Sequence, residues 1–172
     1  KFTELSRQNN TVDSMMNAMN EKYEDAFPDI YKTELEPLQN QKENYNETGT
    51  AKSKLLKGKD LIKEMVVVLG HYPELQQQKD SIRYWANEIS GKFETALPNI
   101  YKEKIKPLED AVDDYMEMGN ISKRLRKGES LYNKLADFEK EYKRVTRQAN
   151  HIEEMFSDFK GKYENEFPNV YK

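Results

Sequence analysis

The sequence predicts an all-α, elongated protein built from tandem three-helix bundles. The first observation is a segment that occurs three times: residues 21–32 read EKYEDAFPDIYK, residues 91–102 read GKFETALPNIYK and residues 161–172 read GKYENEFPNVYK. These copies lie 70 residues apart with no gap, which is typical of tandem structural repeats. The second is an apolar stripe at alternating spacings of three and four residues before each copy. The third is composition: 34% of residues are charged and 36% hydrophobic, as in long helices with narrow apolar faces.

The first predicted helix of each repeat carries this stripe, although the identities of its residues change between copies. In the first copy the stripe consists of Phe2, Leu5, Val12, Met16, Met19, Tyr23 and Ala26. Proline disfavours helical geometry in the preceding residue, so we expect these helices to end near Phe27, Leu97 and Phe167. The residues expected to cap the next helix are Asp29, Asn99 and Asn169.

The second helix of each repeat should run from about residue 30 to 47 and, one repeat later, from about 100 to 117. Each contains an interior proline, Pro37 or Pro107, at which we expect a kink or a break. Gly49 and Gly119 are expected to end these helices in a left-handed conformation.

The third helix should begin after a capping residue, Thr50 or Asn120. Gly58 and Gly128 fall in its middle, at matching positions. Glycine inside a helix costs about 1 kcal/mol relative to alanine, so we expect either a close approach of two helices or a helix break at this point.

The two junctions between repeats differ. Residues 69–73 read LGHYP, and these breakers predict a separation or bend, whereas residues 129–160 contain no Gly or Pro and predict one continuous helix. The expected organisation is a first repeat at 1–70, a second at 71–140, and the first helix and turn of a third at 141–172. This plan resembles spectrin-type repeats in architecture only, because those repeats are longer and no residue motif matches.

Several functional classes are disfavoured by the composition and motifs. The net charge of −3 favours no nucleic-acid partner, and no apolar run is long enough to span a membrane. Cysteine is absent, which excludes disulfides and thiolate metal sites. We find no catalytic, cofactor-binding or metal-binding motif, and expect neither an enzyme nor a cofactor. Because the chain begins with Lys1, we expect a fragment or a processed mature chain.

Two groups of residues are candidate binding sites. The repeated corner offers aromatic and basic side chains to a protein partner, or alternatively only sets the angle between two helices. Its candidate residues are Tyr31, Lys32, Tyr101, Lys102, Tyr171 and Lys172. The start of each third helix is basic and offers a candidate anion site, or alternatively is neutralised by acids at the end of the preceding helix. Its candidate residues are Lys52, Lys54, Lys57, Lys123, Arg124, Arg126 and Lys127.

Two further features concern packing. Glutamine occupies the same position in all three copies, as Gln8, Gln78 and Gln148, where it is expected to bond a neighbouring backbone or set the register. Trp85 stands where the other copies have methionine and is expected in the core or at its rim.

The sequence therefore favours a non-enzymatic helical repeat module that acts as a spacer or scaffold and as a protein-interaction surface. A bacterial surface or secreted protein is the favoured setting, and the partner is unidentified. The third-repeat helix offers a route to self-association. The alternative is peripheral binding to an anionic membrane or cell-wall polymer through the basic helix starts.

Overall fold

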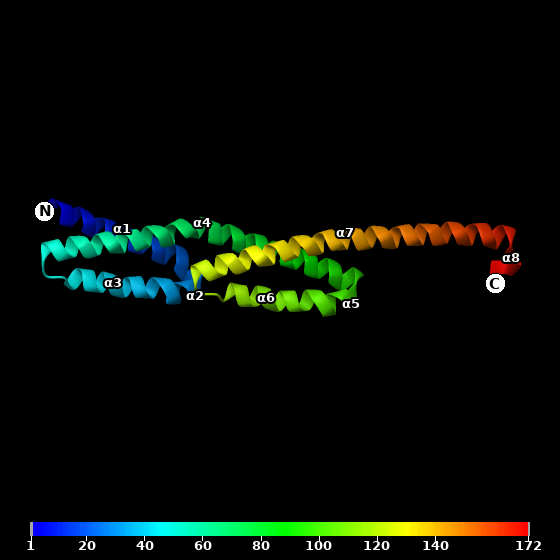
Figure 1. Cartoon of the computed structure of the whole chain (residues 1–172), viewed down its shortest axis with the longest axis horizontal. Coiled ribbons are helices and arrows are strands. Elements are labelled where there is room, and N and C mark those ends of the chain that lie inside the picture. Colours follow the sequence, from blue (N-terminus) through cyan, green and yellow to red (C-terminus); the bar gives the residue numbers. More distant parts are fainter. Residues whose placement is uncertain (1, 172) are drawn as a thin grey trace.

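The computed structural model describes residues 2–171, and the side chains of residues 2–170. Helices occupy nearly all of this described part, and it contains no strand. Figure 1 shows a long, narrow molecule with the N-terminus at one end and α8, the last helix, at the other. The all-α, elongated fold class predicted from the sequence is confirmed.

The described chain has three long helices, which give the molecule its length. They are α1 (Phe2–Ala26), α4 (Ala51–Ala96) and α7 (Ile121–Glu166). α1 packs along the first half of α4, and the second half of α4 packs along the first half of α7. Each of α4 and α7 has 46 residues and is therefore about 69 Å long. One helix thus takes part in two successive bundles.

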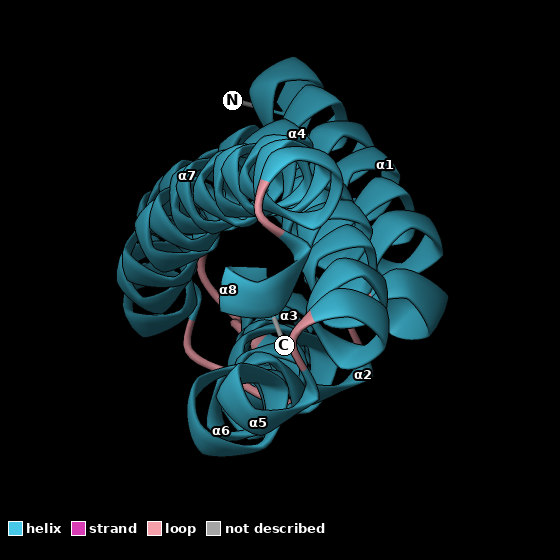
Figure 2. Cartoon of the chain, turned by 90° about the vertical axis from the view of Figure 1, so that its right-hand side faces the viewer, coloured by secondary structure: helices cyan, strands magenta, loops and turns pink. Residues whose placement is uncertain are grey.

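Shorter helical segments run back along each bundle. The first consists of α2 (Pro28–Ile30), η1 (Tyr31–Leu35) and α3 (Glu36–Glu47). The second consists of α5 (Pro98–Ile100), η2 (Tyr101–Ile105) and α6 (Lys106–Met116). A final short helix, α8 (Pro168–Tyr171), follows α7. Figures 1 and 2 both show α3 and α6 on one side of the molecule, below α4 and α7.

The irregularity predicted at Pro37 and Pro107 takes the form of a π-helical turn. In η1 the N–H of Glu36 donates to the carbonyl of Tyr31, five residues earlier, and η2 does the same one period later. In a straight α-helix the proline ring would clash with the carbonyl four residues before it. The wider turn just ahead of the proline accommodates the ring, so the helix continues to Glu47 or Met116 instead of ending.

The predicted N-caps of these segments were wrong. The capping positions of α2 and α5 are Phe27 and Leu97, and neither makes a side-chain cap bond. Proline follows each of them at the first helical position, where its missing N–H costs nothing and its fixed φ favours the helix. The expected caps Asp29, Asn99 and Asn169 are the second residues of α2, α5 and α8.

The caps predicted at the turn after α3 and at its counterpart after α6 were partly wrong and partly confirmed. Neither Gly49 nor Gly119 has a positive φ, so the predicted left-handed caps were wrong. The predicted caps of the long helices are confirmed: the Thr50 side chain accepts from the N–H of Ser53 at 3.3 Å, and Asn120 accepts from Lys123 at 3.0 Å.

Of the separation or bend predicted at residues 69–73, the separation was wrong, because α4 continues through these residues. Figure 1 shows that α4 changes direction partway along its length, as the alternative of a bend expects. Pro73 is exposed, so its ring lies toward water, and the proline leaves the carbonyl of Leu69 without its helical donor. The Tyr72 ring packs edge-on against Tyr23 and Phe27, at centroid distances of 5.4 and 5.9 Å. This packing outweighs the local preference of the residues. The continuous helix predicted over residues 129–160 is confirmed as part of α7.

Two apolar cores lie one behind the other along the molecule. The first bundle is built around residues of α1, η1, α3 and the first half of α4, and Val12, Met19 and Leu61 are among its buried members. The second bundle is built around the second half of α4, η2, α6 and the first half of α7, with Ile89 and Leu131 at its centre. Trp85 is half-buried against the second core, as predicted.

Replacing Pro73 with alanine tests the continuity of α4. The substitution restores an N–H donor to the carbonyl of Leu69 inside an unbroken helix. We expect the free energy of unfolding, measured by urea denaturation, to rise by about 1–3 kcal/mol. The exposed neighbour Glu74 provides the control, and Glu74→Ala should change it by less than about 0.5 kcal/mol. An unchanged or lowered stability in Pro73→Ala would show that the helix is interrupted there.

Candidate functional site

A half-buried polar contact joins α1, α3 and α4 in the first bundle. The Gln8 side chain donates from Nε2 to the carbonyl of Leu55 at 2.9 Å, and its Oε1 lies 3.0 Å from the Tyr45 hydroxyl. The same hydroxyl also donates to Asn9 Oδ1, at 2.6 Å. Its amide lies directly against Gly58, where a Cβ atom would come within 2.2 Å of it. We call Gln8, Tyr45, Leu55 and Gly58 the first glutamine contact.

The same arrangement occurs 70 residues later. Gln78 donates to the carbonyl of Leu125 at 2.9 Å and accepts from the Tyr115 hydroxyl at 2.8 Å. A Cβ atom on Gly128 would lie 2.0 Å from the Gln78 amide. We call these four residues the second glutamine contact. Of the two alternatives expected at the mid-helix glycines, a close approach or a helix break, the structure has the close approach. Of those expected for the glutamines, the bond to a neighbouring backbone is present at Gln8 and Gln78.

The two tyrosines of these contacts stay protonated at neutral pH. Burial raises the pKa of Tyr45, and burial also raises the pKa of Tyr115, because an ionised phenol would lose its hydration. Each hydroxyl is therefore available as a donor to its glutamine. The third glutamine, Gln148, lies on the exposed second half of α7.

A cation lies over each of these tyrosines. Lys54 Nζ is 5.0 Å from the centre of the Tyr45 ring, and the Arg124 guanidinium is 4.7 Å from that of Tyr115. Arg124 is only 1% exposed and donates to the carbonyls of Met116 and Met118 at 3.0 and 3.2 Å. Such cation–π contacts strengthen when the cation is shielded from water. Two of the candidate anion-binding residues therefore have partners within the protein.

The remaining candidate cations fall into two separate groups. Lys52 and Lys57 are exposed at the start of α4, and Lys57 donates to the Thr48 hydroxyl at 3.0 Å. Lys123 and Arg126 are exposed at the start of α7, and Lys127 there is half-buried. Figure 1 shows that α4 begins near the N-terminal end of the molecule, whereas α7 begins at the far end of the first bundle, beside α2. The two basic groups are not brought together.

The repeated corner is largely occupied by internal contacts. The Tyr31 hydroxyl accepts from Gln39 Nε2 at 2.9 Å, and the Tyr101 hydroxyl donates to Glu109 at 3.1 Å. The bond to Glu109 raises the pKa of Tyr101. Both tyrosines are half-buried, whereas Lys32 and Lys102 are exposed. Lys172 and the side chain of Tyr171 lie outside the described residues.

Sequence reasoning missed the contact between the two bundles. The Phe27 ring of the first bundle lies between two cations of the second: Lys79 Nζ at 4.5 Å and the Arg124 guanidinium at 4.9 Å from its centre. Lys79 also donates to the carbonyl of Ala26 at 3.2 Å. Burial lowers the pKa of Lys79.

The start of α7 completes this junction. A carboxylate oxygen of Glu34 accepts from the N–H of Ile121 at 2.8 Å, so a side chain of one bundle caps a helix of the next. Gly119 lies so close to the first bundle that a Cβ atom would come within 2.2 Å of the Thr33 hydroxyl oxygen. The occurrence of glycine at this position was the one sequence signal for the junction, and it was misread as a helix cap.

No residue arrangement in the described chain suggests chemistry at a metal. Within residues 2–171, no three His, Cys, Asp or Glu side chains are grouped so that they could hold an ion. Over the same residues, no helix combines the length and apolar character needed to cross a bilayer.

Comparison of the chain with protein-family models, with curated proteins and with solved structures gave no match.

The glutamine contact can be tested by adding a methyl group at Gly58. In Gly58→Ala the new Cβ displaces the Gln8 amide, which breaks its bonds to Leu55 and Tyr45. Gly91 lies in the same helix with no atom within 4 Å of its Cβ position, so Gly91→Ala is the matched control. We expect Gly58→Ala to be less stable than Gly91→Ala by about 1–3 kcal/mol in urea denaturation.

A double-mutant cycle separates this loss from a general effect of the substitution. In a Gln8→Ala background the displaced amide is absent, so Gly58→Ala should become stabilising by about 1 kcal/mol through helix propensity. If Gly58→Ala is equally destabilising with and without Gln8, the contact does not carry the effect.

Proposed function

We propose that the chain is a non-enzymatic array of tandem helical repeats that acts as a rigid spacer or scaffold. The observation that supports this most strongly is the glutamine contact, which recurs with the same four residue types and the same bonds after 70 residues. A half-buried polar contact of this kind favours one register of the helices over neighbouring registers. A spacer of defined length requires successive bundles in which the helices pack in the same register.

The junction between the bundles supports the same proposal. α4 belongs to both bundles, so a bend between them would have to break or deform a packed helix. The Phe27 ring between Lys79 and Arg124, and the bond from Ile121 to Glu34, further restrict the angle. Repeat arrays in which each unit contacts its neighbours in this way behave as extended, quasi-linear bodies.

A protein-interaction role is the second part of the proposal. The exposed residues of the corner, Lys32 and Lys102, lie beside the half-buried Tyr31 and Tyr101, and offer a basic rim with an aromatic edge. This surface occurs twice at one spacing, so it suits a partner that binds at more than one point. A bacterial surface or secreted protein is the setting that we propose for such an array.

Rigidity can be measured with pairs of spin labels, because the chain contains no cysteine. Ser53→Cys and Glu94→Cys place exposed labels near the two ends of α4, and we expect one narrow distance distribution near about 60 Å. Asn46→Cys with Lys134→Cys joins α3 to α7 across the junction and should also give a single narrow distribution.

Arg124→Gln provides the control for the second pair, because it removes the guanidinium from between Phe27 and Tyr115. It should broaden the Asn46–Lys134 distribution and leave the Ser53–Glu94 distribution unchanged. A broad distribution for both pairs in the otherwise unchanged protein is incompatible with a spacer.

Anionic membrane or cell-wall polymer binding is the second candidate function. Lys52, Lys57, Lys123 and Arg126 are exposed in the first turns of α4 and α7, and such cations attract anionic lipid headgroups. An open depression beside Lys57 is lined by Thr48 and Ser53 but also by Glu47 and Glu64, whose charges oppose an anion. This opposition makes it the weaker of the two candidates.

Sedimentation with phosphatidylserine vesicles at low salt tests this candidate. Binding should fall at least tenfold when Lys52, Lys57, Lys123 and Arg126 are all changed to Gln, because each cation near the surface contributes about 1 kcal/mol. The control changes four other exposed lysines, Lys32, Lys102, Lys104 and Lys106, to Gln. Equal losses in both variants would mean that only net charge matters, and absence of binding at low salt would eliminate this function.

A further inference from the structure

The second half of α7 exposes a row of large apolar side chains. Beyond residue 150 every residue to 170 is exposed, including aromatic residues at helical spacing. The large apolar residues of this row are Ile152, Met155, Phe156, Phe159, Tyr163, Phe167 and Val170. Phe156 is 66% exposed and Phe159 56%. Contiguous apolar surface of this size marks an interaction site on a folded protein.

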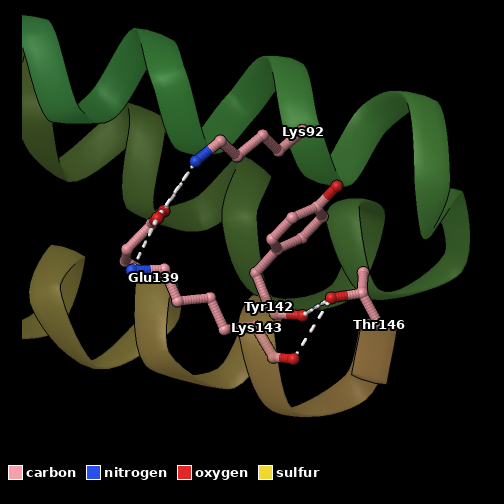
Figure 3. A network of polar contacts seen from close by, with 5 residues as sticks. All are labelled: Lys92, Glu139, Tyr142, Lys143 and Thr146. Atoms are coloured by element: carbon pink, nitrogen blue, oxygen red, sulfur yellow. Dashed lines mark hydrogen bonds and ion pairs between the residues drawn. The ribbon is translucent and has the colours of Figure 1, made fainter. Parts of the chain in front are cut away.

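A polar network marks the place where α7 leaves the second bundle. Figure 3 shows Lys92 of α4 reaching Glu139 of α7, at 3.0 Å, with the Tyr142 ring beside it. Lys92 Nζ lies 5.5 Å from the centre of that ring. One turn later the Thr146 hydroxyl donates to the carbonyl of Tyr142 at 2.8 Å. From there until α8, α7 continues without a neighbouring helix, as Figure 1 shows.

The exposed apolar residues of α7 stand at the same repeat positions as core residues of the two bundles. Residues 70 and 140 positions before Ile152 are Ile82 and Val12, and both are fully buried. Tyr163 corresponds in the same way to Phe93 and Tyr23, which are also fully buried. In both bundles these positions are covered by a returning segment and the following long helix. The exposed face is therefore a third copy of a surface that is covered twice elsewhere in the chain.

The backbone at the end of α7 already turns as it does before each returning segment. Phe167 has φ −134° and ψ 62°, close to the values of −140° and 67° at Phe27 and −137° and 63° at Leu97. α8 then folds back beneath α7 (Figure 1) in the manner of α2 and α5. A chain that continued through α8 would run along the exposed apolar face.

From these observations, and resting on the proposed repeat array, we propose that the face at residues 148–170 docks a two-helix hairpin that enters through α8. The hairpin has the chemistry of residues 98–140: a proline-linked returning helix and a second helix with a mid-helix glycine. Its tyrosine donates to Gln148 Oε1, and a carbonyl of its second helix accepts from Gln148 Nε2. Gln148 is exposed and corresponds to Gln8 and Gln78, which make these bonds in the two bundles.

The test extends the full chain by a copy of residues 103–140 placed after Lys172, since Tyr171-Lys172 corresponds to Tyr101-Lys102. Hydrogen exchange of the backbone amides is compared between the extended and the original chain at low micromolar concentration. We expect at least tenfold slower exchange over residues 150–166 in the extended chain, because covered helices open less often. A second extension, made from residues 33–70, repeats the measurement with an independent hairpin sequence.

Two substitutions on the exposed face of α7 show whether the slower hydrogen exchange comes from covering that face. Ile152→Asp changes a residue that is 59% exposed in the original chain, so that chain should fold as before, while the protection in the extended chain should be lost. Gln148→Ala should reduce the protection only in the extended chain. Trp85→Phe, remote in the second bundle, is the control that should leave the protection intact.

Failure of both extensions to slow exchange over residues 150–166 would overturn the proposal. A second result would also overturn it: light scattering detects a dimer that buries this face in the original chain and that persists in both extended chains. The occupant of the face would then be a second copy of the chain. If either result is found and the distances between the spin labels are still narrowly distributed, the hairpin proposal is rejected and the rigid-spacer proposal is retained.

Discussion

The structure depends on one helix, α4, that is shared by two bundles. The first half of α4 covers α1, and its second half is covered in turn by α6 and α7. A shared helix turns two small cores into one extended body, since neither core can rotate without bending the 46-residue helix between them. It also explains the low apolar fraction of the chain: narrow bundles bury one stripe per helix and leave the other faces in water.

Sharing a helix creates a problem of register, which the glutamine contacts address. Apolar stripes tolerate a shift of one helix along another, because one leucine or methionine packs almost as well as another a turn away. A glutamine that bonds both a backbone carbonyl and a tyrosine hydroxyl tolerates such a shift less well, since the shift would leave these polar groups without partners. This contact requires glycine at positions 58 and 128, because a side chain there would occupy the space of the glutamine amide. Glycine lowers the helix propensity at these positions, and the hydrogen bonds of the glutamine offset that loss.

The sequence was sufficient to predict the helices and their approximate ends at Phe27 and Leu97, and it limited Gly58 and Gly128 to a close approach of two helices or a helix break. These features follow from patterns within one or two turns, such as proline position and apolar spacing. The continuity of α4 through residues 69–73 could not be predicted in that way. It is favoured by Tyr72 packing on Tyr23 of α1 and on Phe27 just after α1, about 45 residues away in the sequence, which outweighs the helix-breaking tendency of Gly70 and Pro73.

The candidate binding residues were harder to predict, for a related reason. Arg124 and Lys123 are neighbours in a basic run, yet one is buried between two aromatic rings and the other lies in water. Composition alone assigns them the same role. What separates them is helical phase: Arg124 lies three residues after Ile121 and four before Gly128, both buried, so it shares their face. The same phase argument applies to α7 as a whole. The apolar stripe by which α7 packs into the second bundle continues along its second half, although every residue from 151 to 170 is exposed.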